Sequence, residues 1–204
     1  MSKSKDPLND CLFTSLVILE WLQIDTAQDL QAVVPGLSVG NDFAFPKIVI
    51  RGVGMNSSFA GVEPSVGMHV DGAVVALSYA HWSSYFDLER VEVLRGPQGT
   101  LYGRNSIGGA VNFITAKPSQ DFAAEVRTLV GSYGMSEGYG FINGGLTDNL
   151  SARLIVVNRS RDGVIDDLGS GIPLDSYEDE NYTLALRWEN DNHTFDIRGN
   201  ERSY

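Results

Sequence analysis

This sequence is poor in the residues that build metal centres and disulfide frameworks. It has one cysteine, Cys11, and three histidines among its 204 residues. A single cysteine excludes an internal disulfide and any site that needs several thiolates. His69, His81 and His193 are too far apart for the paired spacing of a zinc site. We therefore expect no bound metal and no cofactor.

Positive charge and long apolar runs are also scarce. Lys and Arg total 15 against 26 Asp and Glu, which gives a net charge of −11. Such a surface repels phosphate backbones, so nucleic acid is excluded as a partner. No apolar run reaches the roughly 18 residues of a transmembrane helix. In residues 1–25 an apolar run stops at Glu20 without a small-residue cleavage site, so we expect no secretory signal there.

Residues 26–118 read as short apolar segments separated by turn residues. The stretch 26–39 (TAQDLQAVVPGLSV) predicts a short helix that Thr26 caps and Pro35-Gly36 stops. Segments rich in β-branched residues follow, each bounded by glycine, and they predict strands at 47–53, 66–75, 90–96 and 110–115. The pattern predicts a small α+β domain that ends at Lys117-Pro118.

After Pro118 the segments lengthen and alternate more cleanly between apolar and polar residues. Candidate strands lie at 122–130, 138–146, 150–160, 181–190 and 193–204. The clearest places Tyr182, Leu184, Leu186 and Trp188 on one face, with an aromatic residue at each end. Tight turns on one rim, longer loops on the other and such aromatic ends are typical of an outer-membrane barrel. A soluble antiparallel sheet with one wet face alternates in the same way, so the pattern leaves both open.

The glycine-rich stretch 95–115 (RGPQGTLYGRNSIGGAVNFIT) invites comparison with a phosphate-binding loop. Such a loop joins a strand to a helix N-terminus, whereas these glycines run straight into a strand pattern. No G-x-x-x-x-G-K-[ST] motif occurs, and no carboxylate pair is placed for acid–base chemistry, so we expect no enzyme. A backbone role in tight turns and close chain approach remains for Gly52, Gly96, Gly99, Gly103, Gly108 and Gly109.

Residues 88–118 (LERVEVLRGPQGTLYGRNSIGGAVNFITAKP) closely resemble the end of the plug domain of TonB-dependent outer-membrane receptors. The resemblance includes 29–39 (DLQAVVPGLSV), Ile50-Arg51-Gly52 and 63–75 (EPSVGMHVDGAVV), and it covers about residues 26–204. It implies an α+β plug domain at 26–118, with residues 1–25 unassigned. Residues 119–204 would then be about the first five antiparallel strands of a transmembrane β-barrel of about 22 strands. The resemblance favours the membrane barrel over the soluble sheet.

The same resemblance implies a function in transport across the cell outer membrane. Receptors of this family bind a scarce nutrient, with an iron–siderophore favoured here and haem, cobalamin or a glycan as other candidates. TonB, from the inner membrane, supplies the energy, and outer-membrane lipid surrounds the barrel. Neither catalysis nor a cofactor is implied.

The resemblance also assigns roles to particular residues. Arg51 and Arg95 would be a latch that pairs the plug with acidic barrel residues; the alternative is a pair of surface arginines that anchor turns. Two plug loops, 54–63 and 76–86, would face the ligand. Their candidate contacts are Asn56, Phe59, Tyr79, His81, Trp82, Tyr85 and Phe86. Packing against the inner barrel wall is the alternative role for these side chains.

With so few barrel strands, the chain is expected to be a fragment. An open sheet leaves edge N–H and C=O groups unsatisfied in lipid, so the chain alone should neither insert nor transport nor receive TonB. A second hypothesis is a soluble β-rich binding module with a plug-like sequence, in which residues 119–204 form a free sheet.

Overall fold

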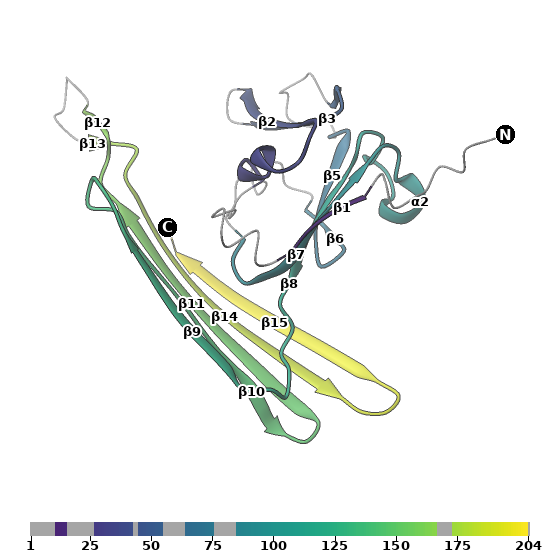
Figure 1. Cartoon of the computed structure of the whole chain (residues 1–204), viewed down its shortest axis with the longest axis vertical. Helices are drawn as coiled ribbons and strands as arrows, with labels where there is room; N and C mark the ends of the chain where they lie inside the picture. Colours follow the sequence, from purple (N-terminus) through teal and green to yellow (C-terminus); the bar gives the residue numbers. More distant parts are fainter. Residues whose placement is uncertain are drawn as a thin grey trace. The chain divides into compact units, whose positions relative to one another are not determined.

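The computed structural model of the chain describes residues 11–15, 27–42, 45–54, 64–75, 85–166 and 173–203. Clustering of contacts divides the chain into two compact units, Met1–Ala116 and Lys117–Tyr204. Strands dominate both units (Figure 1). Within the ranges given above, no helix has the length and apolar character needed to cross a membrane.

The first unit is built on a five-stranded sheet. In spatial order its strands are β1 (Cys11–Ser15), β7 (Leu88–Arg95), β8 (Gly109–Thr115), β5 (Val66–Val70) and β6 (Ala73–Val74). Neighbours run antiparallel except β5 and β8, which are parallel. A separate three-stranded sheet contains β2 (Leu37–Asp42), β3 (Phe45–Ile50) and β4 (Val53–Gly54). Residues 11–15, in the segment that the sequence left unassigned, thus form an edge strand.

The core of the first unit lies on one face of the five-stranded sheet. Alternate residues of β5, β7 and β8 supply its fully buried apolar side chains: Val66, Met68, Val91, Val93, Val111 and Phe113. Leu30, Val34, Ile48 and Ile50 join the same cluster from the chain before β4. Burying each such side chain contributes about 1.5–3 kcal/mol, which makes this cluster the main source of the unit's stability.

Two predicted strands are in fact hairpins. The segment 47–53 turns at Arg51–Gly52 (φ 51° and 81°), and the segment 66–75 turns at Asp71–Gly72 (φ 49° and 80°). Two consecutive residues in the left-handed region form the tight turn that joins antiparallel strands. The prediction of one strand in each segment is therefore wrong. In the sequence, short apolar runs on the two sides of such a turn look like one continuous strand.

The predicted helix, from Thr26 to Val33, is shorter than expected. The structure has only a four-residue 3₁₀ turn, η2 (Asp29–Ala32), which precedes the left-handed Gly36 (φ 81°) and strand β2. Leu30 and Val34 are buried, but the side chain of Gln28 at the helix start makes no capping hydrogen bond. Thr26 lies outside the described residues. One more short helix, α2 (Gly99–Tyr102), follows β7.

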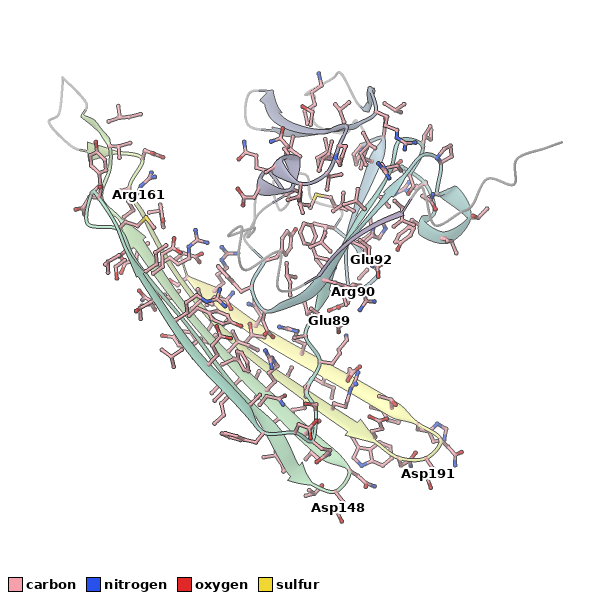
Figure 2. The ribbon with its side chains drawn as sticks, in the orientation of Figure 1. Glu89, Arg90, Glu92, Asp148, Arg161 and Asp191 are labelled. Carbon is pink, nitrogen blue, oxygen red and sulfur yellow. The ribbon has the colours of Figure 1, made fainter. Side chains whose placement is uncertain are left out.

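The second unit is a single antiparallel sheet of five long strands. In order they are β9 (Ala123–Val130), β10 (Ser136–Thr147), β11 (Leu150–Arg161), β14 (Tyr177–Glu189) and β15 (Thr194–Ser203). Asp148 and Asp191, in the short turns, lie at one end of the sheet, and Arg161 lies at the other (Figure 2). The connection after Arg161 holds a small hairpin of β12 (Ile165–Asp166) and β13 (Pro173–Leu174).

Candidate functional site

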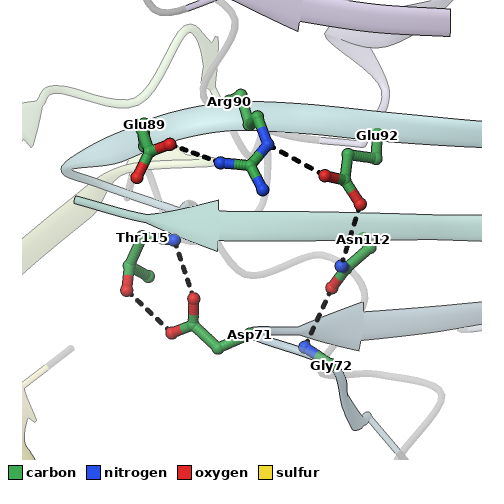
Figure 3. Close-up of polar contacts among 7 residues, drawn as sticks. All are labelled: Asp71, Gly72, Glu89, Arg90, Glu92, Asn112 and Thr115. Atoms are coloured by element: carbon green, nitrogen blue, oxygen red, sulfur yellow. Dashed lines mark hydrogen bonds and ion pairs between the residues drawn. The ribbon is translucent and has the colours of Figure 1, made fainter. Parts of the chain in front are cut away.

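The turn between β5 and β6 is fastened to β8 by four hydrogen bonds (Figure 3 draws three of them). The Asp71 carboxylate accepts from the backbone N–H of Thr115 at 2.9 Å and from its hydroxyl at 2.7 Å. The Asp71 N–H donates to the Phe113 carbonyl at 2.9 Å, and the Gly72 N–H donates to Asn112 Oδ1 at 3.1 Å. Bonds to an ionised carboxylate are the strong ones, so Asp71 dominates this clamp.

A second chain of polar contacts runs from β8 to β7. Asn112 donates from Nδ2 to Glu92 Oε2 at 3.4 Å, and Glu92 Oε1 accepts from Arg90 Nε at 2.8 Å (Figure 3). Arg90 also forms an ion pair with Glu89. The hydrogen bond with Glu92 is the main cause that raises the pKa of Arg90 above its usual range. Asn112 thereby links the β5–β6 turn to β7.

None of these clamp residues was among the predicted site residues. Two signals in the sequence could have found them. Asp71-Gly72 is the pair preferred in two-residue hairpin turns, and Asn112 is a polar residue in the otherwise apolar strand β8. Such a buried polar side chain needs hydrogen-bond partners.

The two predicted latch arginines lie at the ends of strands that converge on one glycine. Arg51 is exposed and follows β3, whereas Arg95 is half-buried, ends β7 and pairs with Gly109. A Cβ on Gly109 would meet the Leu94 carbonyl oxygen, and Ile50 Cδ1 at 3.0 Å. Gly109 therefore lets β3 and β7 come together beside the two arginines.

The predicted turn glycines fall into three groups. Positive φ angles are found at Gly52, Gly96, Gly103 and Gly109. At Gly108 a Cβ would lie 2.9 Å from the Val53 carbonyl oxygen, which is closer than real Cβ atoms come. Gly99 starts α2 and has open space around it, so nothing in its surroundings requires glycine.

Most of the residues predicted to face a ligand, namely Asn56, Phe59, Tyr79, His81 and Trp82, lie outside the described residues. Tyr85 stacks on Phe113, with ring centroids 4.2 Å apart and an interplanar angle of 22°, and packs against the core of the first unit. Phe86, next to it, is half-buried. Tyr85 therefore contributes to the core of its own unit.

The sheet of the second unit has one apolar face, and that face is exposed. The strand registers place Val126, Ile142, Leu154, Leu184 and Ile197 on the same side. Val126 is 83% exposed, Leu184 49% and Ile197 69%. A soluble sheet would bury such a face against a core, so this arrangement marks a surface for an apolar environment.

Every arginine of these strands lies on the opposite face. They are Arg127, Arg153, Arg159, Arg161, Arg187, Arg198 and Arg202. Carboxylates on the same side form ion pairs with several of them. Arg187 bonds both oxygens of Asp196, at 2.7 and 2.9 Å, and Arg202 bonds both of Asp179, at 2.8 and 2.7 Å.

Aromatic rings occur on both faces in different roles. On the polar face, Arg153 lies over the ring of Phe141, 3.7 Å from its centroid. On the apolar face, Trp188 and Phe195 face each other across β14 and β15 with centroids 5.7 Å apart, next to the short turn at Asp191. Exposed aromatic rings at one end of an apolar band are typical of a membrane interface.

The described parts of both units hold no group of three or more His, Cys, Asp or Glu that could bind a metal ion. What they contain is a clamped plug-like sheet and a sheet whose two faces differ sharply in polarity. Both arrangements serve packing and binding.

Comparison with known proteins finds similarity to one family. Residues 18–110 match the family model for the TonB-dependent Receptor Plug Domain. The pesticin receptor of Yersinia pestis is 43% identical over 96 residues, which are 46% of this chain and 14% of that receptor. The vitamin B12 transporter BtuB of Vibrio vulnificus is 29% identical over 157 residues, or 71% of this chain and 25% of the transporter.

A solved structure extends the similarity to almost the whole chain. The ferric yersiniabactin uptake receptor FyuA from Yersinia pestis superposes with a TM-score of 0.86 at 26% identity, over 94% of this chain and 31% of that one. The chain thus spans less than a third of the length of these relatives. Residues 18–110 thus match a plug domain of the TonB-dependent receptors, and the plug with the antiparallel strands that follow it resembles the same part of a solved receptor.

Proposed function

We propose that this chain is the plug and the first strands of an outer-membrane receptor that takes up a scarce nutrient. The observation that carries the proposal is the exposed apolar face of the second unit, in a chain whose first unit matches a plug. An apolar face that is exposed on long strands has its natural partner in lipid acyl chains.

The dimensions of the sheet support a lipid partner. Strands β10, β11, β14 and β15 have 12, 12, 13 and 10 residues. A tilted transmembrane strand needs about 9–11 residues to cross the bilayer core, so each of these strands is long enough. The arginine-rich face would then line the interior of a closed barrel, where charged side chains remain in a polar environment.

An iron–siderophore is the ligand that we favour. FyuA is a ferric yersiniabactin uptake receptor, and a catecholate siderophore receptor of Escherichia coli is also related, at 31% identity over 97 residues. Cobalamin is the second candidate because BtuB transports vitamin B12. Haem and glycans remain further candidates. We assign ligand contact to Asn56, Phe59, Tyr79, His81, Trp82 and Phe86, and core packing to Tyr85.

Energy for uptake would come from TonB, which acts on the plug. Transport by this chain alone is not expected, because the outer strands β9 and β15 each pair with only one neighbour. Unpaired edge groups are too costly in lipid, so further strands must complete the barrel. A soluble binding module is disfavoured, since it would hold its apolar face in water.

Arg51 and Arg95 are proposed to latch the plug to carboxylates of the barrel. The ends of β3 and β7 that carry these arginines both lie beside Gly109. Barrel carboxylates that bind there would therefore hold both strands at one place. A buried ion pair loses several kcal/mol, about 3–5, when one partner is removed. Arg95→Gln should therefore loosen the plug more than Arg104→Gln, a matched change in the exposed turn before Ser106.

Growth under iron limitation tests the proposed function. The complete reading frame that contains this chain would be expressed in a strain without siderophore receptors and supplied with single ferric siderophores, haem or cobalamin. We expect growth on at least one ferric siderophore, and none when TonB is deleted. Growth on no source, together with a soluble monomeric product that ends at Tyr204, would overturn the proposal in favour of a soluble module.

A further inference from the structure

His69 is a buried histidine at the centre of the first unit that neither the latch nor the ligand loops use. It lies on β5, is only 2% exposed, and has Asn112 on β8 and Val74 on β6 as its cross-strand partners. Its ring meets the ring of Tyr102 edge-on, with centroids 4.7 Å apart at 65°. Tyr102 is the last residue of α2, so this contact connects α2 to the sheet.

The space around the imidazole is tightly filled. A Cβ on Gly67 would come within 2.8 Å of His69 Cε1 and 3.2 Å of Ser106 Oγ. Ser106 is 1% exposed, and its Oγ lies 3.5 Å from the carbonyl oxygens of Tyr102 and Arg104. The chain from α2 to Ser106 therefore packs against the ring.

The imidazole of His69 is poorly supplied with hydrogen-bond partners in this position. Nδ1 is buried and has no hydrogen-bond partner within the described part of the chain. Asn112, its neighbour on β8, already uses its carbonyl for Gly72 and its amide for Glu92. Desolvation by burial is the main effect on the pKa of His69 and lowers it, while the nearby backbone of Gly67 acts in the opposite direction.

The described carboxylates on the neighbouring elements already have partners. Asp71, in the β5–β6 turn, is bonded to Thr115, and Glu92 on β7 is bonded to Arg90 and Asn112. Strand β6 contributes only Ala73 and Val74, and α2 contributes no ionisable side chain but Tyr102. The covering chain carries one cation, Arg104, whose side chain is exposed.

We propose that His69 is an acid-sensitive catch, which holds residues 96–108 on the sheet while it is neutral and releases them when the imidazole gains a proton. A protonated ring has two N–H donors and a charge that must be solvated. Water reaches it only if the covering chain moves. The bonds that would open are Gln98 N–H to Ser106 O and Gly108 N–H to Ser65 O, each at 2.8 Å.

The sign of the effect follows from linkage. Burial favours the neutral ring in the folded state, so the folded pKa lies below the unfolded value of 6.5. The contribution to stability is complete above that value and is lost as the pH falls from it toward the folded pKa. The release therefore belongs to mildly acidic conditions, and it does not depend on which nutrient the receptor carries.

Amide hydrogen exchange of the full chain in detergent micelles tests the catch. Protection at Gln98, Tyr102 and Gly108 would be compared at about pH 7.5 and about pH 5.5, after correction for intrinsic exchange. We expect it to fall by at least about threefold in the wild type. In His69→Gln, which cannot gain the proton, it should stay constant. His193→Gln, a control at an exposed histidine in the β14–β15 turn, should keep the wild-type fall.

Two outcomes would overturn the proposal. One is wild-type protection that does not change with pH, and the other is the same fall in His69→Gln. Should His69→Gln fail to fold, the NMR titration of the wild-type imidazole decides. A midpoint at the ordinary pKa of a histidine, without any loss of protection at Gly108, would equally contradict the catch.

Discussion

The two units of this chain treat apolar side chains in opposite ways. In the first unit, the side chains of Phe113 and Val111 on β8 are at most 1% exposed, and they share a core with residues of η2 and the β2–β3 hairpin. In the second, Leu184 and Ile197 on β14 and β15 are 49% and 69% exposed, although their strands are longer. Both units alternate along their strands, so alternation alone does not tell which face meets which medium.

The difference teaches that the apolar face of each sheet is matched to its surroundings. A sheet in water needs a second layer over its apolar face, and the first unit has one. A sheet in lipid needs none there and must instead satisfy its polar face, which the second unit does with ion pairs such as Arg202–Asp179. Four predictions follow this contrast from the largest effect to the smallest.

The core of the first unit should be the most sensitive to truncation. Phe113→Ala is expected to cost about 3–5 kcal/mol, because it removes a fully buried ring that also stacks on Tyr85. The free energy of opening, from hydrogen exchange at β7 and β8 in the full chain, measures it. Ile197→Ala on the exposed face should change the same quantity by less than about 0.5 kcal/mol. Equal losses of opening free energy for Phe113→Ala and Ile197→Ala would contradict the contrast between the two units.

Charge on the two faces of the second unit's sheet should act differently once the complete receptor is in the membrane. Leu184→Arg is expected to destabilise it by about 2–4 kcal/mol, because the guanidinium would face acyl chains. Asn200→Arg, at an exposed position on the arginine-bearing face of the neighbouring strand β15, should cost clearly less. The readout is the fraction of folded receptor recovered from outer membranes, and similar losses for the two variants would contradict the assignment of faces.

The Asp71 clamp should contribute an intermediate amount. Asp71→Ala leaves the Thr115 N–H and hydroxyl without their acceptor, and we expect a loss of about 1–3 kcal/mol in the opening free energy at Thr115. Glu89→Gln, at an exposed ion pair of the same sheet, is the matched control with an expected change of about 0–1 kcal/mol. If Asp71→Ala costs no more stability than Glu89→Gln, the hydrogen bonds of Asp71 contribute no more than a surface contact does.

The ion pairs of the β14–β15 hairpin should give the smallest effects. A double-mutant cycle on Arg187 and Asp196 is expected to yield about 0.2–1 kcal/mol of coupling, and added salt should weaken it. The Arg202–Asp179 pair has side chains only 15% and 10% exposed, against 24% and 37%, so its coupling should be larger and less sensitive to salt. If chemical denaturation gives a larger coupling energy for Arg187–Asp196 than for Arg202–Asp179, this description of the polar face is contradicted.

The sequence predicted the long strands well because each carries its own pattern. Strand β11 runs over Leu150–Arg161 against a predicted 150–160, and the alternation of residues 182–188 matches the two faces of β14. The short elements were harder. At Arg51–Gly52 and Asp71–Gly72 two left-handed residues reverse the chain inside an apolar run, which periodicity does not register.

Contacts between distant segments lay beyond sequence reasoning. The ring of Tyr85 looked free to meet a ligand, and only the fold brings it onto Phe113. Likewise Asp71 and Thr115 lie 44 residues apart, and the parallel pairing of β5 with β8 makes them neighbours. Such contacts depend on the order in which the strands pair, and no local sequence pattern specifies that order.

The central claim is that the face of the second unit carrying Leu184 lies in an apolar medium and the face carrying Asn200, the exposed partner of Thr183 on β15, does not. Single cysteines at positions 184 and 200, on a Cys11→Ser background, would carry an environment-sensitive fluorophore in the full chain bound to lipid-like micelles. We predict that a spin-labelled acyl chain quenches the label at 184 and that aqueous iodide quenches the label at 200. Equal quenching at both positions by either agent would contradict the account.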